Sequence, residues 1–209
     1  MRVRWTALLA SFVLLVPASA TAQGIAAWDS PIFLPPRPGD DLGVYLIDPS
    51  GGEWALAGIW RQSGNLNLGV RAGIADDEGE DGISVLFGAE FYGPITRSGR
   101  AFPLDIAWLL GVGATVDDGT FLRIPAGLSI GRVFASGGLV FLPYIVPRVG
   151  LDVFAADDET ETEFSFTADL GVDLEIDRSL LLRFGVALGE HDAIGVGLAW
   201  RWGRSVAAR

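Results

Sequence analysis

His191 is the only histidine in this 209-residue chain and the side chain best suited to general acid–base chemistry. It lies between two acids in the run Glu190-His191-Asp192. A general base needs a partner within hydrogen-bond reach, and no serine is close to His191 in the sequence. Because the chain has no Cys, it lacks a thiol nucleophile, a thiolate metal site and a disulfide framework. We therefore expect a solvated loop histidine, no enzyme activity, no cofactor and no metal site.

Acidic residues form short runs, which makes them the next candidates for chemistry. Residues 76–81 and 157–163 are rich in Asp and Glu, and carboxylate clusters can gather divalent cations. Residues 76–81 lack the ligand spacing of a calcium loop, so we expect a solvated acidic rim, with divalent cations as candidate partners. The net charge of −11 excludes nucleic acid as a partner.

The N-terminal residues 1–22 have the pattern of a secretory signal peptide. Arg2 and Arg4 precede an apolar run at 8–17, and small residues at 18–20 and 20–22 each offer a cleavage site. No later stretch approaches the roughly 20 apolar residues of a membrane helix. Residues 23–41 form a Pro-rich arm without a regular element, and the sequence assigns them no role. We expect an exported protein.

From residue 42 to 202 apolar and polar residues alternate with a period of two, which indicates β-strands. In 163–175, for example, Phe166 and Leu170 share one face while Asp169 and Asp173 share the other. About ten such segments occur, with eight as the alternative number, and residues 203–209 form a tail. The segments are 42–48, 53–62, 65–75, 82–92, 102–116, 120–133, 138–153, 162–175, 179–189 and 193–202.

The face opposite the large apolar residues carries a nearly balanced set of charges. A soluble β-protein would place these charges in water, whereas a membrane barrel encloses them in its lumen and exposes the apolar set to lipid. We expect the membrane arrangement, with Phe166 and Leu182 outside, Arg183 inside, and ion pairs that close the lumen. The expected lumen charges are Arg71, Glu90, Asp105, Arg123, Arg148, Asp152, Asp169, Asp173, Arg183 and Arg201.

Aromatic residues and loop charges support this arrangement. Aromatic side chains gather near segment ends, as the two interfacial girdles of a membrane barrel require. The expected girdle residues are Trp54, Trp60, Phe91, Phe164, Phe166, Trp200 and Trp202. Every second connection is acidic, whereas the others are short or carry arginine. This pattern predicts an all-β, closed, antiparallel, up-and-down transmembrane barrel with one acidic end.

The last segment resembles the closing strand of a known family. Gly197, Trp200 and Trp202 form the G-x-x-aromatic-x-aromatic signal of small bacterial outer-membrane β-barrel proteins, although this chain continues to residue 209. The resemblance implies a monomer in the outer membrane that contacts its lipid and is inserted by the barrel assembly machinery. We expect a non-catalytic structural or surface-interaction role. The alternatives are a narrow porin for small solutes, or a barrel enzyme acting on lipid A or peptides through His191.

Overall fold

The computed structural model describes residues 26–50, 52–64, 67–77, 82–156 and 159–202. The expected signal peptide, the tail at 203–209 and the middle of two acidic loops, at 78–81 and 157–158, lie outside the described residues. Within the described ranges, no helix is long and apolar enough to cross a membrane.

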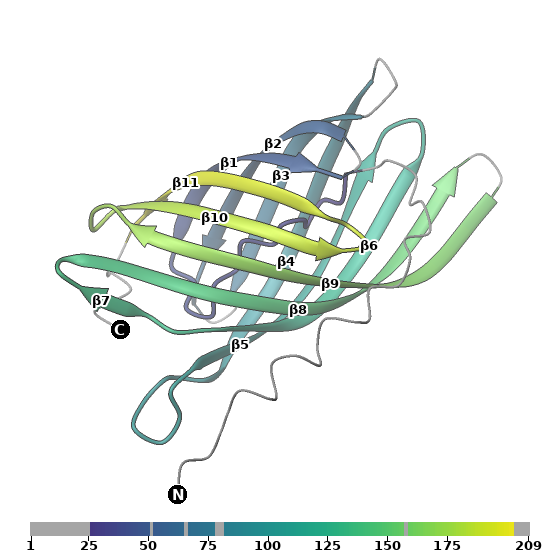
Figure 1. The fold of residues 1–209 in the computed structure, drawn as a ribbon. Helices are drawn as coiled ribbons and strands as arrows, with labels where there is room; N and C mark the ends of the chain where they lie inside the picture. Colours follow the sequence, from purple (N-terminus) through teal and green to yellow (C-terminus); the bar gives the residue numbers. More distant parts are fainter. Residues whose placement is uncertain (1–25, 51, 65–66, 78–81, 157–158, 203–209) are drawn as a thin grey trace, which may run out of the picture.

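Eleven β-strands make up the regular structure of the described chain (Figure 1). Their bounds follow the expected segments closely, except for the additional three-residue strand β7. The strands are β1 (Asp41–Pro49), β2 (Gly52–Gln62), β3 (Leu68–Asp77), β4 (Ile83–Thr96), β5 (Asp105–Val116), β6 (Thr120–Gly131), β7 (Phe134–Ser136), β8 (Leu139–Ala156), β9 (Glu159–Glu175), β10 (Leu180–Gly189) and β11 (Ala193–Arg201).

The sheet closes on itself. Consecutive strands pair antiparallel except β6 and β7; β6 instead pairs with β8, and β1 pairs with β11. Ten strands therefore form the barrel wall, and β7 extends only one edge of β8. Closure leaves each wall strand with a partner on both sides, as a backbone in lipid requires. The expected fold class is confirmed, with ten wall strands rather than eight.

The alternating sequence sets the two faces of the wall. In β1 and β11 every second residue is buried and the residues between are exposed. Outside, apolar side chains such as Val44 and Leu198 face each other across the β1–β11 ladder. Inside, Arg183 lies directly opposite Asp173 in the β9–β10 ladder. An apolar exterior around a charged interior is the arrangement of a transmembrane barrel.

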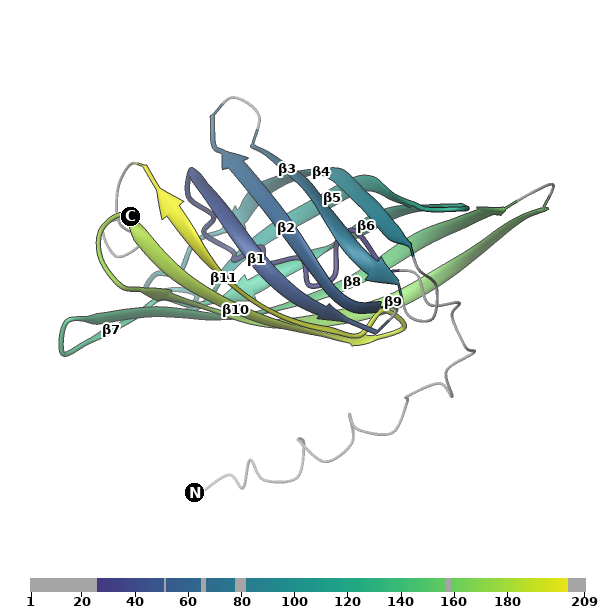
Figure 2. The same ribbon diagram turned by 90° about the horizontal axis from the view of Figure 1, so that it is seen from above.

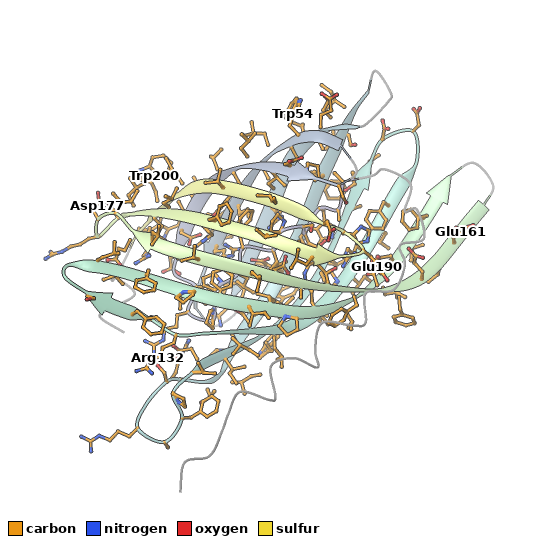
Figure 3. The ribbon with its side chains drawn as sticks, viewed as in Figure 1. Trp54, Arg132, Glu161, Asp177, Glu190 and Trp200 are labelled. Atoms are coloured by element: carbon orange, nitrogen blue, oxygen red, sulfur yellow. The ribbon has the colours of Figure 1, made fainter. Side chains whose placement is uncertain are left out.

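The two ends of the barrel carry different charges. The connections β1–β2, β3–β4, β5–β6, β8–β9 and β10–β11 meet at one end, which we call the acidic end. The remaining connections form the arginine end, where Arg97, Arg100, Arg132 and Arg178 are exposed. In Figure 3 the labelled Glu161 and Glu190 lie toward the acidic end, and Asp177, Arg132 and Trp200 lie toward the arginine end.

The Pro-rich arm lies inside the barrel. Residues 26–40, which we call the lumen segment, run through the interior without regular structure, and all of residues 26–36 are buried. In Figures 1 and 2 the segment appears as the dark purple chain enclosed by the strands. It contains one cis peptide bond, between Ser30 and Pro31. The sequence left the position of this arm open, and the structure makes it the filling of the barrel.

Candidate functional site

The interior of the barrel is the candidate site, because it combines the buried charges with the lumen segment. Side chains of the wall hold the main chain of this segment along its length. Arg71 donates hydrogen bonds to the carbonyl oxygens of Trp28 at 2.9 Å, Pro31 at 2.9 Å and Ile32 at 3.0 Å. Arg61 donates a further bond to the carbonyl of Ile32 at 3.1 Å. The wall therefore satisfies carbonyl groups that an irregular buried segment would otherwise leave unpaired.

Asp29 ties the lumen segment to two arginines of the wall. Its Oδ1 lies 3.2 Å from Nε of Arg123, and its Oδ2 forms an ion pair with Nη1 of Arg148. Each arginine also pairs with a wall carboxylate: Arg123 with Asp152 at 3.0 Å and Arg148 with Asp169 at 2.6 Å. The five side chains form one buried network, in which the segment supplies the shared anion.

Two aromatic side chains of the segment fit against glycines of the wall. A Cβ on Gly88 would overlap the indole ring of Trp28, and a Cβ on Gly195 would lie 2.6 Å from the ring of Phe33. Phe33 also stacks on Tyr45 with ring centroids 4.5 Å apart. Close approach therefore requires glycine at these positions, so the wall is shaped to receive this segment.

A second charge cluster lies nearer the arginine end. Arg183 pairs with Asp173 at 2.8 Å and Asp41 at 3.1 Å, and it donates a hydrogen bond to Tyr45 Oη at 2.7 Å. Two further pairs are Arg61 with Glu90 at 2.6 Å and Arg201 with Glu175 at 3.4 Å. At the end of the lumen segment, Arg37 pairs with Asp105 at 2.8 Å.

All ten residues assigned to the lumen from the sequence are buried inside the barrel. The structure brings together Arg123 with Asp152, Arg148 with Asp169, and Arg183 with Asp173. The other four members have partners outside that set: Arg71 holds the lumen segment, Arg201 contacts Glu175, Glu90 pairs with Arg61, and Asp105 pairs with Arg37.

Sequence reasoning missed several residues of the interior, among them Asp29, Asp41, Tyr45 and Arg61. Arg61 alternates with Trp60 in a predicted strand, so the period of two could have placed it inside. Asp29 lies in a stretch without periodicity and gave no such signal.

His191 is buried, and the expectation of a solvated loop residue is wrong. It belongs to the β10–β11 connection, but its ring turns into the barrel, lies 5.3 Å from the ring of Phe121 and places Nε2 2.9 Å from Asp152. The hydroxyl of Ser30 contacts this residue at its carbonyl oxygen, at 2.6 Å, and not at its ring. The described contacts therefore make His191 part of the ion network and give its ring no serine nucleophile.

The expected girdle residues fall on the outer face. Trp54, Phe164, Phe166, Trp200 and Trp202 are exposed, and Trp60 and Phe91 are half-buried. Trp54 and Trp200 lie in different parts of the barrel exterior (Figure 3). Of the expected assembly signal, Gly197 faces inward beneath the ring of Tyr45, whereas the two tryptophans face out. Among the described residues, no group of three or more His, Asp or Glu side chains is arranged to hold a metal ion.

Comparisons with known proteins find distant structural likeness only. No protein-family model and no curated protein matches the chain. Among solved structures, a KdgM porin is 8% identical over 78% of this chain and 99% of that chain, with a TM-score of 0.39. Its complex with disordered oligogalacturonate has the same identity and coverage and a TM-score of 0.41.

A third similar structure is Ail, the attachment invasion locus protein of Yersinia pestis, in complex with the heparin analogue sucrose octasulfate. It is 8% identical over 79% of this chain and 100% of that chain, with a TM-score of 0.29. These structures are outer-membrane β-barrels.

Proposed function

We propose that this chain is a non-catalytic outer-membrane β-barrel whose lumen is closed by its own residues 26–40, and that it has a structural or surface-interaction role. The observation that carries the proposal is the buried lumen segment, held at Asp29 by Arg123 and Arg148. A passage for solutes would have to displace this segment. Displacement would leave two buried guanidinium groups without the carboxylate that they share, which is energetically costly.

The outer-membrane location rests on three features of the chain. The exterior is apolar, the first 22 residues have the pattern of an export signal, and the last strand resembles an assembly signal. We place the acidic end outside the cell, where its carboxylates would meet divalent cations and the anionic headgroups of the outer leaflet. The proposed partners are therefore outer-membrane lipid, divalent cations and, during insertion, the barrel assembly machinery. We propose that the protein is a monomer.

Planar-bilayer recording of the refolded full chain tests the closed lumen. We expect no reproducible conductance steps from the wild type. The double variant Trp28→Ala/Asp29→Ala removes one aromatic contact and the shared carboxylate, so it should show openings. Asp118→Ala, an exposed change at the acidic end, is the matched control and should stay closed. Regular steps from the wild type would instead favour the second candidate, a narrow porin.

The enzyme alternative has a separate test. The wild-type barrel should hydrolyse neither lipid A nor peptides, because the described contacts of His191 lead to Asp152 and to the lumen segment. Hydrolysis by the wild type that is lost in His191→Ala would contradict the non-catalytic proposal.

A further inference from the structure

The lumen segment begins at the acidic end. The carbonyl oxygen of Ala26 accepts a hydrogen bond from Thr115 Oγ1 at 2.6 Å, and Thr115 lies two residues before Asp117 in the acidic β5–β6 connection. Four residues later, Ser30 reaches His191 in the β10–β11 connection, which belongs to the same end. Ala26, the first residue that the structure describes, therefore lies at the acidic end of the barrel.

The segment ends at the arginine end. Arg97 donates a hydrogen bond to the carbonyl oxygen of Pro36 at 2.8 Å. Asp40 then accepts hydrogen bonds from the amides of Ser63, at 2.6 Å, and of Trp202, at 3.1 Å. Each of these three partners lies at the end of the barrel where β1 starts and β11 finishes. Residues 26–40 thus run through the barrel from its acidic end to its arginine end.

This crossing changes the topology of the chain. Ten wall strands alone would place the start of β1 and the end of β11 on the same side of the membrane, as the β1–β11 pairing of Asp41 with Arg201 shows. The lumen segment adds an eleventh crossing through the interior. We infer that Ala26 and Trp202, the first and last residues that the structure describes, face opposite sides of the membrane, with Ala26 at the acidic end.

The contacts of the segment hold it in this position. Between the two ends, Trp28 packs against Gly88 and Phe33 packs against Gly195, and the Asp29 network lies close to the acidic end. The segment cannot move along the barrel axis without breaking all three contacts. That Ala26 faces the outside of the cell rests on the orientation proposed above, whereas the placement of Ala26 and Trp202 at opposite ends of the barrel does not.

Single-cysteine labelling of the full chain tests the inference, because the natural sequence has no cysteine that would react. The variants are Gly24→Cys near the N-terminal end, Arg209→Cys at the C-terminal end, Ser50→Cys at the acidic end and Ser179→Cys at the arginine end. Each is expressed in cells and treated with a membrane-impermeant maleimide, before and after the outer membrane is permeabilised.

We expect Gly24→Cys to react under the same condition as Ser50→Cys, and Arg209→Cys to react together with Ser179→Cys. Reaction of Gly24→Cys together with Arg209→Cys and Ser179→Cys would overturn the inference. So would a Gly24→Cys variant that reacts only after the barrel is unfolded, because its N-terminal end would then not be presented. If Ser179→Cys rather than Ser50→Cys reacted in intact cells, the proposed orientation would be wrong, but opposite reactivity of the two chain ends would still support the eleventh crossing.

Discussion

Substitution of Asp29 by alanine removes the carboxylate that the lumen segment places between Arg123 and Arg148. Asp29 is fully buried and lies between Arg123 and Arg148, each of which keeps a second carboxylate, Asp152 or Asp169. Breaking a buried ion pair by removing one partner costs about 3–5 kcal/mol. Because both arginines retain a partner, we expect Asp29→Ala to lower the free energy of unfolding by about 3 kcal/mol, at the low end of this range.

Denaturant titrations of the barrel folded into lipid vesicles measure this loss, with linear extrapolation to zero denaturant. Asp29→Asn should cost less than Asp29→Ala, because the amide keeps one hydrogen-bond acceptor near the guanidinium groups. Asp118→Ala also removes one acid, but from an exposed loop, and should change stability by less than about 0.5 kcal/mol. If Asp29→Ala behaved like Asp118→Ala, Asp29 would not lie between the two arginines and the reasoning would fail.

Three further predictions concern the contact of Gly88 with Trp28, the outer face and a turn. Gly88→Ala should destabilise the barrel, because the new methyl group overlaps the Trp28 indole, and adding Trp28→Ala should recover part of that loss of stability. Unfolding titrations of the two single variants and the double variant measure the coupling, and strictly additive costs would contradict it. Leu182→Arg should cost about 2–4 kcal/mol by placing a charge in the lipid, and more than Leu182→Ala in the same titration; an equal cost would argue against a lipid-facing Leu182. The amide and hydroxyl of Ser179 hold the pKa of Asp177 below its ordinary value, so this turn is stabilised above the unfolded carboxyl pKa of about 3.9 and loses that contribution as pH falls through the lower folded value. Stability measured between neutral pH and about pH 3 should therefore fall more in the wild type than in Asp177→Asn, and parallel curves would refute the contribution.

The wall of the barrel was predictable because its information is local. A strand that faces lipid on one side and a charged interior on the other must alternate with a period of two, and a register shift of one residue would expose every charge. The alternation in Leu180–Gly189 therefore predicted both the strand and the inward direction of Arg183. The strand ends were predictable because acidic and Gly-rich residues interrupt the alternation.

The contents of the barrel were not predictable in the same way. The Pro-rich arm has no periodicity, and its partners lie far away in the sequence: Asp29 is 119 residues from Arg148. Alternation assigns Gly88 and Gly195 to the inner face, but it does not say which side chain occupies the space above them. His191 was misplaced for a related reason, because its two acidic neighbours suggested a solvated loop while its ring partner, Asp152, comes from another strand.

Disulfide trapping between the lumen segment and the wall tests the central claim most directly. Ser129 Oγ donates a hydrogen bond to the carbonyl oxygen of Leu34 at 2.7 Å, so the wall at Ser129 lies next to the backbone of the lumen segment. In the cysteine-free chain, Leu34→Cys combined with Ser129→Cys should crosslink on mild oxidation of the folded barrel, detected as a shift in gel mobility after unfolding. Leu34→Cys combined with Leu128→Cys is the matched control, because Leu128 neighbours Ser129 but faces outward, and it should not crosslink. Crosslinking of the first pair alone is the result predicted for a barrel filled by residues 26–40, whereas no crosslink in the first pair, or equal crosslinking in both, would contradict it.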